Sequence, residues 1–391
     1  MKKYARFYIV AALSVLTFVL IQLRDPAIVR EYIESKTYDL RLRFRNMVHK
    51  PPTDDKIVIV VVDEKSIAEI GRWPWSRAVQ ARLLQRISAS RPKVIGIDIM
   101  YSEPENRKND ARLARAIRRA GNVVQATAFT VEGGKQREEA PAPPGFLWDA
   151  AFMEVKSVPG IDWKRWAVKP EDVAPPIEEV ATGATLGHVT NIPDMDGVLR
   201  WDIMYVNYGD DCYPSLPLQV ARIASGTSMK DTVLYGGSGI QMGQRFIRTD
   251  LSGRVLINYR GKEKSFPHVS ACDILKRRVS PDILRGKIVL VGTSALATFD
   301  QKITPFSANF PGVEKNANVV ANILDNNFIR KSPGLFELVT IIVTSLVLIL
   351  ALPRLKATPG VVLSFGLMGG YFLVSCYLLV RYNIWLNLVS P

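Results

Sequence analysis

Three long apolar runs stand out along the chain, and mixed polar sequence fills the space between the first two. The runs cover residues 7–23, 335–352 and 360–380. A helix rises about 1.5 Å per residue and must cross a hydrocarbon core of roughly 30 Å, so each run suits a membrane span. A cleaved signal peptide is the alternative for the first run, but no small-x-small cleavage site follows it. The pattern predicts three spans and a lipid bilayer as partner.

Basic residues beside the runs predict their orientation. The first run follows Lys2, Lys3 and Arg6, and the link between the last two contains Arg354 and Lys356. Basic residues near spans stay on the cytoplasmic side. We expect a multi-pass protein of the bacterial inner membrane, with its large domain in the periplasm or outside the cell. The predicted order is a cytoplasmic N-terminus (1–6), an extracytoplasmic domain (24–334), a cytoplasmic link (353–359) and an extracytoplasmic tail (381–391).

The tail turns apolar again at Ile384, and Trp385 stands where an interfacial anchor would lie. Three spans leave this tail outside the cytoplasm, so a signal needs one further crossing to reach the cell interior. We therefore expect a fourth span and a cytoplasmic effector after Pro391.

Between the first two runs, the pattern alternates between strand and helix. Short apolar runs predict strands at 56–62, 93–100, 122–129 and 287–291, and helical stripes of apolar residues predict helices at 76–90, 110–120 and 312–324. Strands and helices that alternate at this spacing form a parallel sheet covered by helices. The predicted fold class is α/β with a parallel-rich sheet. Residues 132–180, with PAPPG and three tryptophans, predict an insertion or a loop-rich lobe.

Charge and cysteine content narrow the possible partners. The formal net charge is +14. An exported domain does not meet nucleic acid routinely, so contact with anionic lipid explains this charge better, and no nucleic-acid partner is expected. Cys212 and Cys272 would face an oxidising compartment, and whether they form a disulfide stays open. No C-x-x-C pair or zinc-like histidine spacing occurs, so neither a metal site nor a cofactor is expected.

Candidate ligand-binding residues lie where the predicted strands end. Asp63 and Asp98 each sit at the carboxyl end of a predicted parallel strand, where ligands of such sheets bind. The alternative is that Asp63 caps the following helix and Asp98 pairs with a nearby base. Thr293 belongs to a strand end that is either a phosphate-cradling turn or only a tight turn. Arg200 begins a further strand and either pairs with Asp196 or points at a ligand.

Other motifs favour structural roles. The stretch 194–197 resembles a calcium loop but fails the EF-hand register, so we expect a turn with Gly197 at positive φ. Trp73 and Trp75 are expected to hold the turn into the following helix. The basic helix face of Arg112, Arg115, Arg118 and Arg119 is either a solvated surface or an anion site. No G-x-S-x-G motif occurs, and no catalytic residue is predicted.

A series of motifs resembles the CHASE type two family, the cyclase- and histidine-kinase-associated sensory extracellular domains of bacteria. The resemblance covers roughly residues 30–330, and the stretch GRWPWSR at 71–77 is its most specific part. The other matching stretches are YDLRLR at 38–43, VDEKS at 62–66, GIDIMYSEP at 96–104, DMDGVLR at 194–200, GKIVLVG at 286–292, TP at 304–305 and FPGVE at 310–314.

The resemblance implies the input domain of a transmembrane receptor coupled to a cytoplasmic nucleotide cyclase or kinase, and it names no stimulus. Members usually have three spans after this domain, whereas two are predicted here and no effector domain follows them. The chain itself is then no enzyme. A membrane-anchored extracytoplasmic enzyme or binding scaffold is the alternative. We also expect a homodimer, because anchoring helices commonly signal by changing their packing against a partner.

Overall fold

The computed structural model describes residues 32–48, 55–131, 141–295 and 300–388, together with Ile9, residues 13–17, residues 19–20, Arg24 and Thr298. These residues divide into two compact units. Unit 1 comprises Met1–Pro51, Asp194–Gly197 and Ile329–Pro391, and unit 2 comprises Pro52–Pro193 and Val198–Phe328. The predicted span at 7–23 lies mostly outside the described residues.

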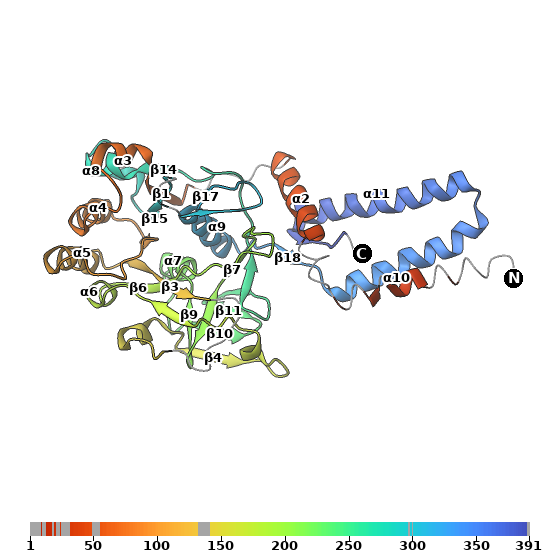
Figure 1. The fold of residues 1–391 in the computed structure, drawn as a ribbon, viewed down its shortest axis with the longest axis horizontal. Helices are drawn as coiled ribbons and strands as arrows, with labels where there is room; N and C mark the ends of the chain where they lie inside the picture. Colours follow the sequence, from red (N-terminus) through yellow and green to blue (C-terminus); the bar gives the residue numbers. More distant parts are fainter. Residues whose placement is uncertain are drawn as a thin grey trace. The chain divides into compact units, whose positions relative to one another are not determined.

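Unit 2 is built on a parallel sheet (Figure 1). In spatial order its parallel strands are β14 (His268–Ser270), β1 (Ile57–Val62), β15 (Ile288–Thr293), β2 (Val94–Ile97), β3 (Val123–Thr130) and β6 (Thr185–His188). The antiparallel strand β5 (Asp172–Ala174) pairs with β3 at the edge. The predicted α/β class with a parallel-rich sheet is therefore confirmed. The late strand β15 lies between β1 and β2, an order that the sequence did not predict.

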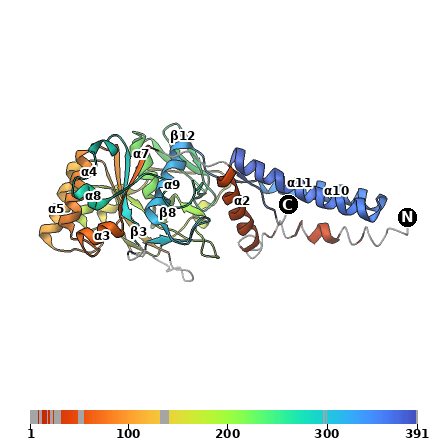
Figure 2. The same cartoon turned by 90° about the horizontal axis from the view of Figure 1, so that it is seen from above.

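Helices cover both faces of this sheet (Figures 1 and 2). One face carries α3 (Glu64–Ile70), α4 (Arg77–Ala89), α5 (Arg107–Ala120) and α8 (Ala271–Leu275), and the other carries α7 (Leu216–Ala224) and α9 (Gly312–Asp325). Successive side chains of a strand point to opposite faces, so Val58 and Val60 pack on the α4 side while Ile57 and Ile59 pack on the α9 side. Burial on both faces explains why β1 is a continuous apolar run.

Residues 141–180, part of the predicted loop-rich segment, contain short elements that join two sheets. They form the 3₁₀-helices η3 (Gly145–Ala150) and η4 (Trp163–Arg165) and the strands β4 (Glu154–Ser157) and β5. Strand β4 borders a second sheet that continues with β10 (Thr232–Gly236), β11 (Gly239–Met242) and β12 (Arg245–Arg248). The indole of Trp163 is buried, and a Cβ at Gly236 would lie 2.3 Å from it. The segment is thus an ordered lobe with its own core residue.

The remaining elements of unit 2 are short. They are the hairpin of β8 (Tyr205–Tyr208) and β9 (Asp211–Pro214), the pair of β7 (Trp201–Ile203) and β13 (Arg254–Leu256), the pair of β16 (Gln301–Lys302) and β17 (Phe310–Pro311), the helix α6 (Glu178–Ala181) and the 3₁₀-helix η5 (Pro281–Ile283). Cys212 and Cys272 are buried free thiols, so the disulfide that the sequence left open is not formed.

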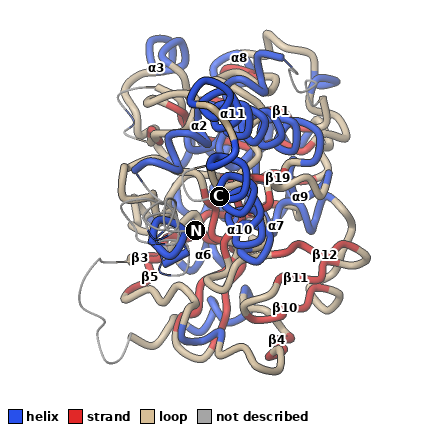
Figure 3. Tube along the Cα trace, turned by 90° about the vertical axis from the view of Figure 1, so that its right-hand side faces the viewer, coloured by secondary structure: helices blue, strands red, loops and turns tan. Residues whose placement is uncertain are grey.

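Unit 1 contains two helices that are long and apolar enough to cross a membrane, judged by length and composition. They are α10 (Gly334–Ala351) and α11 (Ala357–Tyr382), joined through η7 (Leu352–Arg354) (Figure 3). A third helix, α2 (Ser35–Val48), contacts α11. The turn Asp194–Gly197 also belongs to this unit, and the Asp196 carboxylate lies 3.7 Å from the Lys36 ammonium.

The segments that flank the α10–α11 hairpin are hydrogen-bonded to each other. Strand β18 (Arg330–Lys331), just before α10, pairs in parallel with β19 (Ile384–Trp385), just after α11. Here the Ser332 N–H donates to the Trp385 carbonyl at 2.9 Å. A buried ion pair of 2.8 Å joins Arg41 and Glu34 of the N-terminal segment, and the indole N–H of Trp385 donates to Glu34 at 2.9 Å. Polar groups therefore fasten both ends of the hairpin and α2 together.

Candidate functional site

The carboxyl edge of the parallel sheet places a buried polar cluster beside α9. Asp98 follows β2 directly, and its backbone N–H donates to the Val291 carbonyl of β15 at 2.8 Å. Its carboxylate accepts a hydrogen bond of 2.8 Å from the Asn316 side chain of α9. Because parallel strands end at the same edge, the ends of β3 and β6 bring further side chains there. We call Asp98, His188, Asp202, Lys315 and Asn316 the α9 cluster.

A buried ion pair is part of this cluster. The Lys315 ammonium lies 2.7 Å from Asp202 Oδ1, and each side chain is 2% exposed. Two charges taken out of water lose several kcal/mol of hydration each, so such a pair persists only with close geometry. Lys315 also acts electrostatically on Asp98 and on the imidazole of His188. The Lys315 ammonium thus influences three titratable neighbours, Asp98, His188 and Asp202.

Burial shifts the protonation equilibria of the cluster. Burial, assisted by the nearby Asp300 carboxylate, raises the pKa of Asp98 to about 7, against the attraction of Lys315. Burial likewise raises the pKa of Asp202, with Lys315 opposing the shift. For His188, burial and then the Lys315 charge lower the pKa to about 3, so its imidazole is neutral at physiological pH. The cluster therefore changes charge near neutral pH through Asp98.

Unsatisfied polar atoms line the same edge. Neither ring nitrogen of His188 has a hydrogen-bond partner among the described residues, and the same holds for Thr127 Oγ1, Gln125 Oε1, Asn316 Oδ1 and Asp202 Oδ2. Thr127 and His188 are register partners in β3 and β6. A buried polar atom without a partner costs about 1–3 kcal/mol, so these atoms call for water or for the polar groups of a small solute.

A second polar stripe runs along α9 at a spacing of four residues. Asn322 Oδ1 accepts from the Asn258 N–H at 2.8 Å, and Asn318 Oδ1 accepts from the Arg260 N–H at 2.9 Å. Glu314 accepts from the Ser265 N–H at 2.7 Å, and burial raises the pKa of Glu314 to about 7. The stripe binds the backbone of residues 258–265 to the helix. Lys315 and Asn316 of the α9 cluster therefore lie on a helix that also binds the segment 258–265.

Of the four predicted ligand-binding residues, Asp98 alone belongs to the α9 cluster. Asp63 caps α3, where it accepts from the Ser66 N–H at 2.8 Å, and it also accepts from the Ser270 hydroxyl at 2.5 Å. Burial would raise the pKa of Asp63, but these hydrogen bonds outweigh it and lower the pKa. Thr293 is buried at the end of β15, opposite Val62 of β1. Arg200 is 1% exposed, and its carbonyl accepts from the Ile257 N–H.

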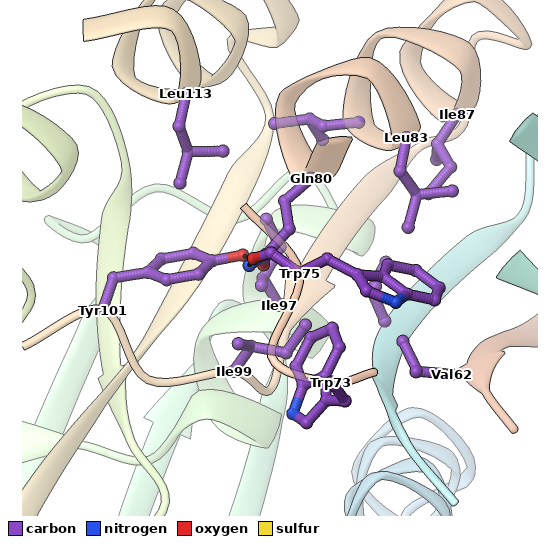
Figure 4. A pocket seen from close by; sticks show the side chains of 12 residues that line it. Val62, Trp73, Trp75, Gln80, Leu83, Ile87, Ile97, Ile99, Tyr101 and Leu113 are labelled. Carbon is purple, nitrogen blue, oxygen red and sulfur yellow. Dashed lines mark hydrogen bonds between the residues drawn. The ribbon is translucent and has the colours of Figure 1, made fainter. Parts of the chain in front are cut away.

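The residues predicted to be structural lie in turns. Gly197 has φ of 78°, the positive value that its turn requires. The Trp75 indole is 6% exposed and donates to the Gly71 carbonyl at 2.9 Å, and Trp73 packs edge-on against it. Both tryptophans line a hollow of about 10 Å³ together with Gln80 and Tyr101 (Figure 4). That volume holds one water at most, so the hollow is a packing feature.

Most of the α9 cluster was not predicted from the sequence. His188 ends β6, a strand too short to show a period, and Asp202 lies in the three-residue strand β7. The signal for α9 was present, since Glu314, Asn318 and Asn322 recur every four residues in a helix expected to cover a buried sheet. Among the described residues, no group of three or more His, Cys, Asp or Glu side chains forms a metal site.

One comparison with known proteins assigns the family. No curated protein and no solved structure matches the chain. A family model described as the CHASE2 domain matches residues 11–350, which is most of the chain and includes both helical layers, the sheet and nearly all of α10. CHASE2 domains are extracellular sensory domains, not catalytic ones. The resemblance carried by the motifs is thereby confirmed, and this chain belongs to the CHASE2 family.

Proposed function

We propose that this chain is the extracytoplasmic input region of a bacterial transmembrane receptor, and that the α9 cluster recognises a small polar stimulus. The observation that carries the proposal is the set of buried, unsatisfied polar atoms beside the Lys315–Asp202 ion pair. The sensory family supports the functional class, and the unsatisfied atoms support the α9 cluster as the proposed place of recognition. Its mixture of neutral acceptors, one ammonium and titratable carboxylates suits a solute with both hydrogen-bond donors and acceptors.

The covalent route from the cluster to the candidate spans is short. Helix α9 ends at Asp325, strand β18 follows, and α10 begins at Gly334. A solute that pairs with Asn316 or His188 would change the hydrogen bonding of α9 and thereby the segment that leads into α10. We propose that the response then reaches a cytoplasmic nucleotide cyclase or kinase. The setting proposed is a homodimer in the inner membrane, with α10 and α11 as spans.

The site is tested by binding to the full chain in neutral-lipid nanodiscs. The probes are a panel of free amino acids, dicarboxylic acids and monosaccharides, and the readout is hydrogen exchange of α9 and β18. A binding probe should protect both segments in the wild type. Asp98→Asn should keep the fold and lose at least about tenfold in affinity, the loss expected for one strong hydrogen bond. The matched control is Asp282→Asn at an exposed carboxylate.

Protection by a probe that is unaffected by Asp98→Asn would remove the α9 cluster as the site. Loss of folding together with binding in that variant would show that Asp98 has a structural role.

The receptor topology is tested separately. Reporter fusions after residue 330 should report the periplasm, and fusions within residues 353–359 should report the cytoplasm. Periplasmic activity at both positions would contradict the two-span arrangement of α10 and α11.

A further inference from the structure

The opposite face of the sheet carries a cleft between two helices. Helices α4 and α5 pack side by side there (Figures 1 and 2). The cleft has a volume of about 300 Å³ and is lined by Ala78, Ala81, Arg82, Gln85, Arg112, Arg115 and Arg119. Two small alanines of α4 leave room between the helices. This volume is at the lower end of the range for small-molecule sites.

The arginines converge because of helix geometry. Arg112, Arg115 and Arg119 are spaced three and four residues apart, so they form one stripe along α5. The apolar stripe of the same helix, with Leu113 and Ile117, is buried against the sheet and turns the arginines outward. Arg82 faces them from α4. Three of the four arginines of the basic face noted in the sequence thus form one wall of a cleft.

No counter-charge is supplied by the described part of the chain. The cleft lining contains no carboxylate, and none of its four arginines forms an ion pair with another described residue. Neighbouring arginines behave differently, since Arg77 approaches the Asp110 carboxylate and Arg118 donates to the Glu179 carbonyl. Like charges at this spacing repel each other. An anion in the cleft would relieve that repulsion.

We propose that this arginine cleft binds a soluble polyvalent anion, with two or more phosphate or carboxylate groups. From Arg112 to Arg119 the stripe extends about 10 Å, at about 1.5 Å per residue, so the anionic groups must span a similar distance. Guanidinium groups pair with phosphate and carboxylate oxygens through two parallel hydrogen bonds. A concave site of this size fits a discrete molecule better than a lipid surface. It lies on the sheet face opposite the α9 cluster and does not depend on the function proposed there.

The test is calorimetric titration of the full chain in neutral-lipid nanodiscs with tripolyphosphate and, separately, with orthophosphate. Tripolyphosphate should bind at one site per chain, about tenfold or more tighter than orthophosphate, because several groups pair at once. Arg115→Gln with Arg119→Gln should weaken tripolyphosphate binding at least about tenfold. The matched control, Arg107→Gln with Lys108→Gln, removes two cations from the same helix outside the cleft and should change binding less than about twofold.

Three results would overturn the proposal. One is equal affinity for tripolyphosphate and orthophosphate. Another is an equal loss in the cleft variant and the control variant, which would show nonspecific attraction to a basic protein. The last is cleft-dependent binding to vesicles with anionic lipid but no saturable binding of tripolyphosphate, which would assign the arginines to a membrane surface. Circular dichroism of each variant checks that α5 is intact.

Discussion

The helices α4 and α5 on one face of the parallel sheet are buried differently from α9 on the other face. On one face, α4 and α5 turn apolar side chains inward and keep their arginines in solvent. On the other, α9 is buried on every side and carries Glu314, Lys315 and Asn316 into the interior. Apolar burial is worth about 25 cal/mol per Å² and needs no partner, whereas each buried polar group needs one. The buried side of α4 and α5 therefore contributes stability and leaves their arginines free for the proposed anion cleft, whereas α9 holds its polar groups in the interior.

Removing the cation from the α9 face should have the largest effect. Lys315→Met leaves Asp202 buried without its partner, and such changes cost about 3–5 kcal/mol. Thermal and urea unfolding of the variant measure the loss. Lys156→Met, at an exposed pair with Glu154, is the control and should change the free energy of unfolding by about 1 kcal/mol or less. The double variant Lys315→Met with Asp202→Leu should recover part of the loss, because the unpaired Asp202 carboxylate is removed as well.

The apolar face should show a different kind of loss. Trp75→Ala removes a buried indole from the turn before α4 and should cost about 3 kcal/mol or more of stability. Trp148→Ala, at a residue 60% exposed, is the control and should be close to neutral. Urea unfolding measures both. A stable Trp75→Ala variant with altered signalling would make this turn a ligand contact and weaken the division between the faces.

The α9 face should also respond to pH. The pKa of Asp98 is raised to about 7, so its neutral form is favoured in the folded protein. The associated stability is present below the ordinary pKa of a carboxyl group and is lost as pH rises through 7. The side chain introduced by Asp98→Asn cannot ionise. Between pH 4 and pH 8 the free energy of unfolding of this variant should therefore fall by at least about 1 kcal/mol less than that of the wild type. Glu314 retains some pH dependence in the variant. The same pH dependence of the free energy of unfolding in the variant and the wild type would contradict the raised pKa of Asp98.

The smallest expected effect comes from two buried threonines that differ in their hydrogen bonds. Thr127→Val removes a buried hydroxyl that has no partner among the described residues, so it should leave stability unchanged or raise it by about 1 kcal/mol. Thr190→Val removes a buried hydroxyl that bonds both the N–H and the carbonyl of Phe129, so it should cost about 1–2 kcal/mol. Thermal unfolding distinguishes them. A loss of the same size in Thr127→Val would show that the edge is already satisfied by ordered water.

The sequence predicted two kinds of element. They are helices with one buried face, such as α4 and α5, and strands buried over several successive residues, such as β1 and β3. β1, β3, α4 and α5 begin and end within a few residues of the predicted bounds. Asp98 was singled out because ligands of parallel sheets bind where strands end, and its role in binding stays a prediction. The place of β15 between β1 and β2 was not predictable, because pairs such as Val60 and Val291 are far apart in the chain and no local pattern encodes the register.

The rest of the candidate site depends on tertiary packing. Lys315 shows no unusual local feature, and its burial arises because α9 lies between the sheet and the segment 258–265. His188 is neutral because of its surroundings, which single-residue chemistry does not reveal. Helical periodicity predicts one buried face, and a helix buried on all sides departs from it. The polar repeat of Glu314, Asn318 and Asn322 was the available clue.

The pairing of β18 with β19 has a mechanical consequence for the two candidate spans. Hydrogen bonds at Arg330 and Ser332 join the chain just before α10 to the chain just after α11. The hairpin is thus closed covalently at one end and by strand pairing at the other. A force applied through the chain at β18 cannot separate the two helices without breaking these bonds. While these bonds hold, a force applied at β18 therefore acts on α10 and α11 at the same time.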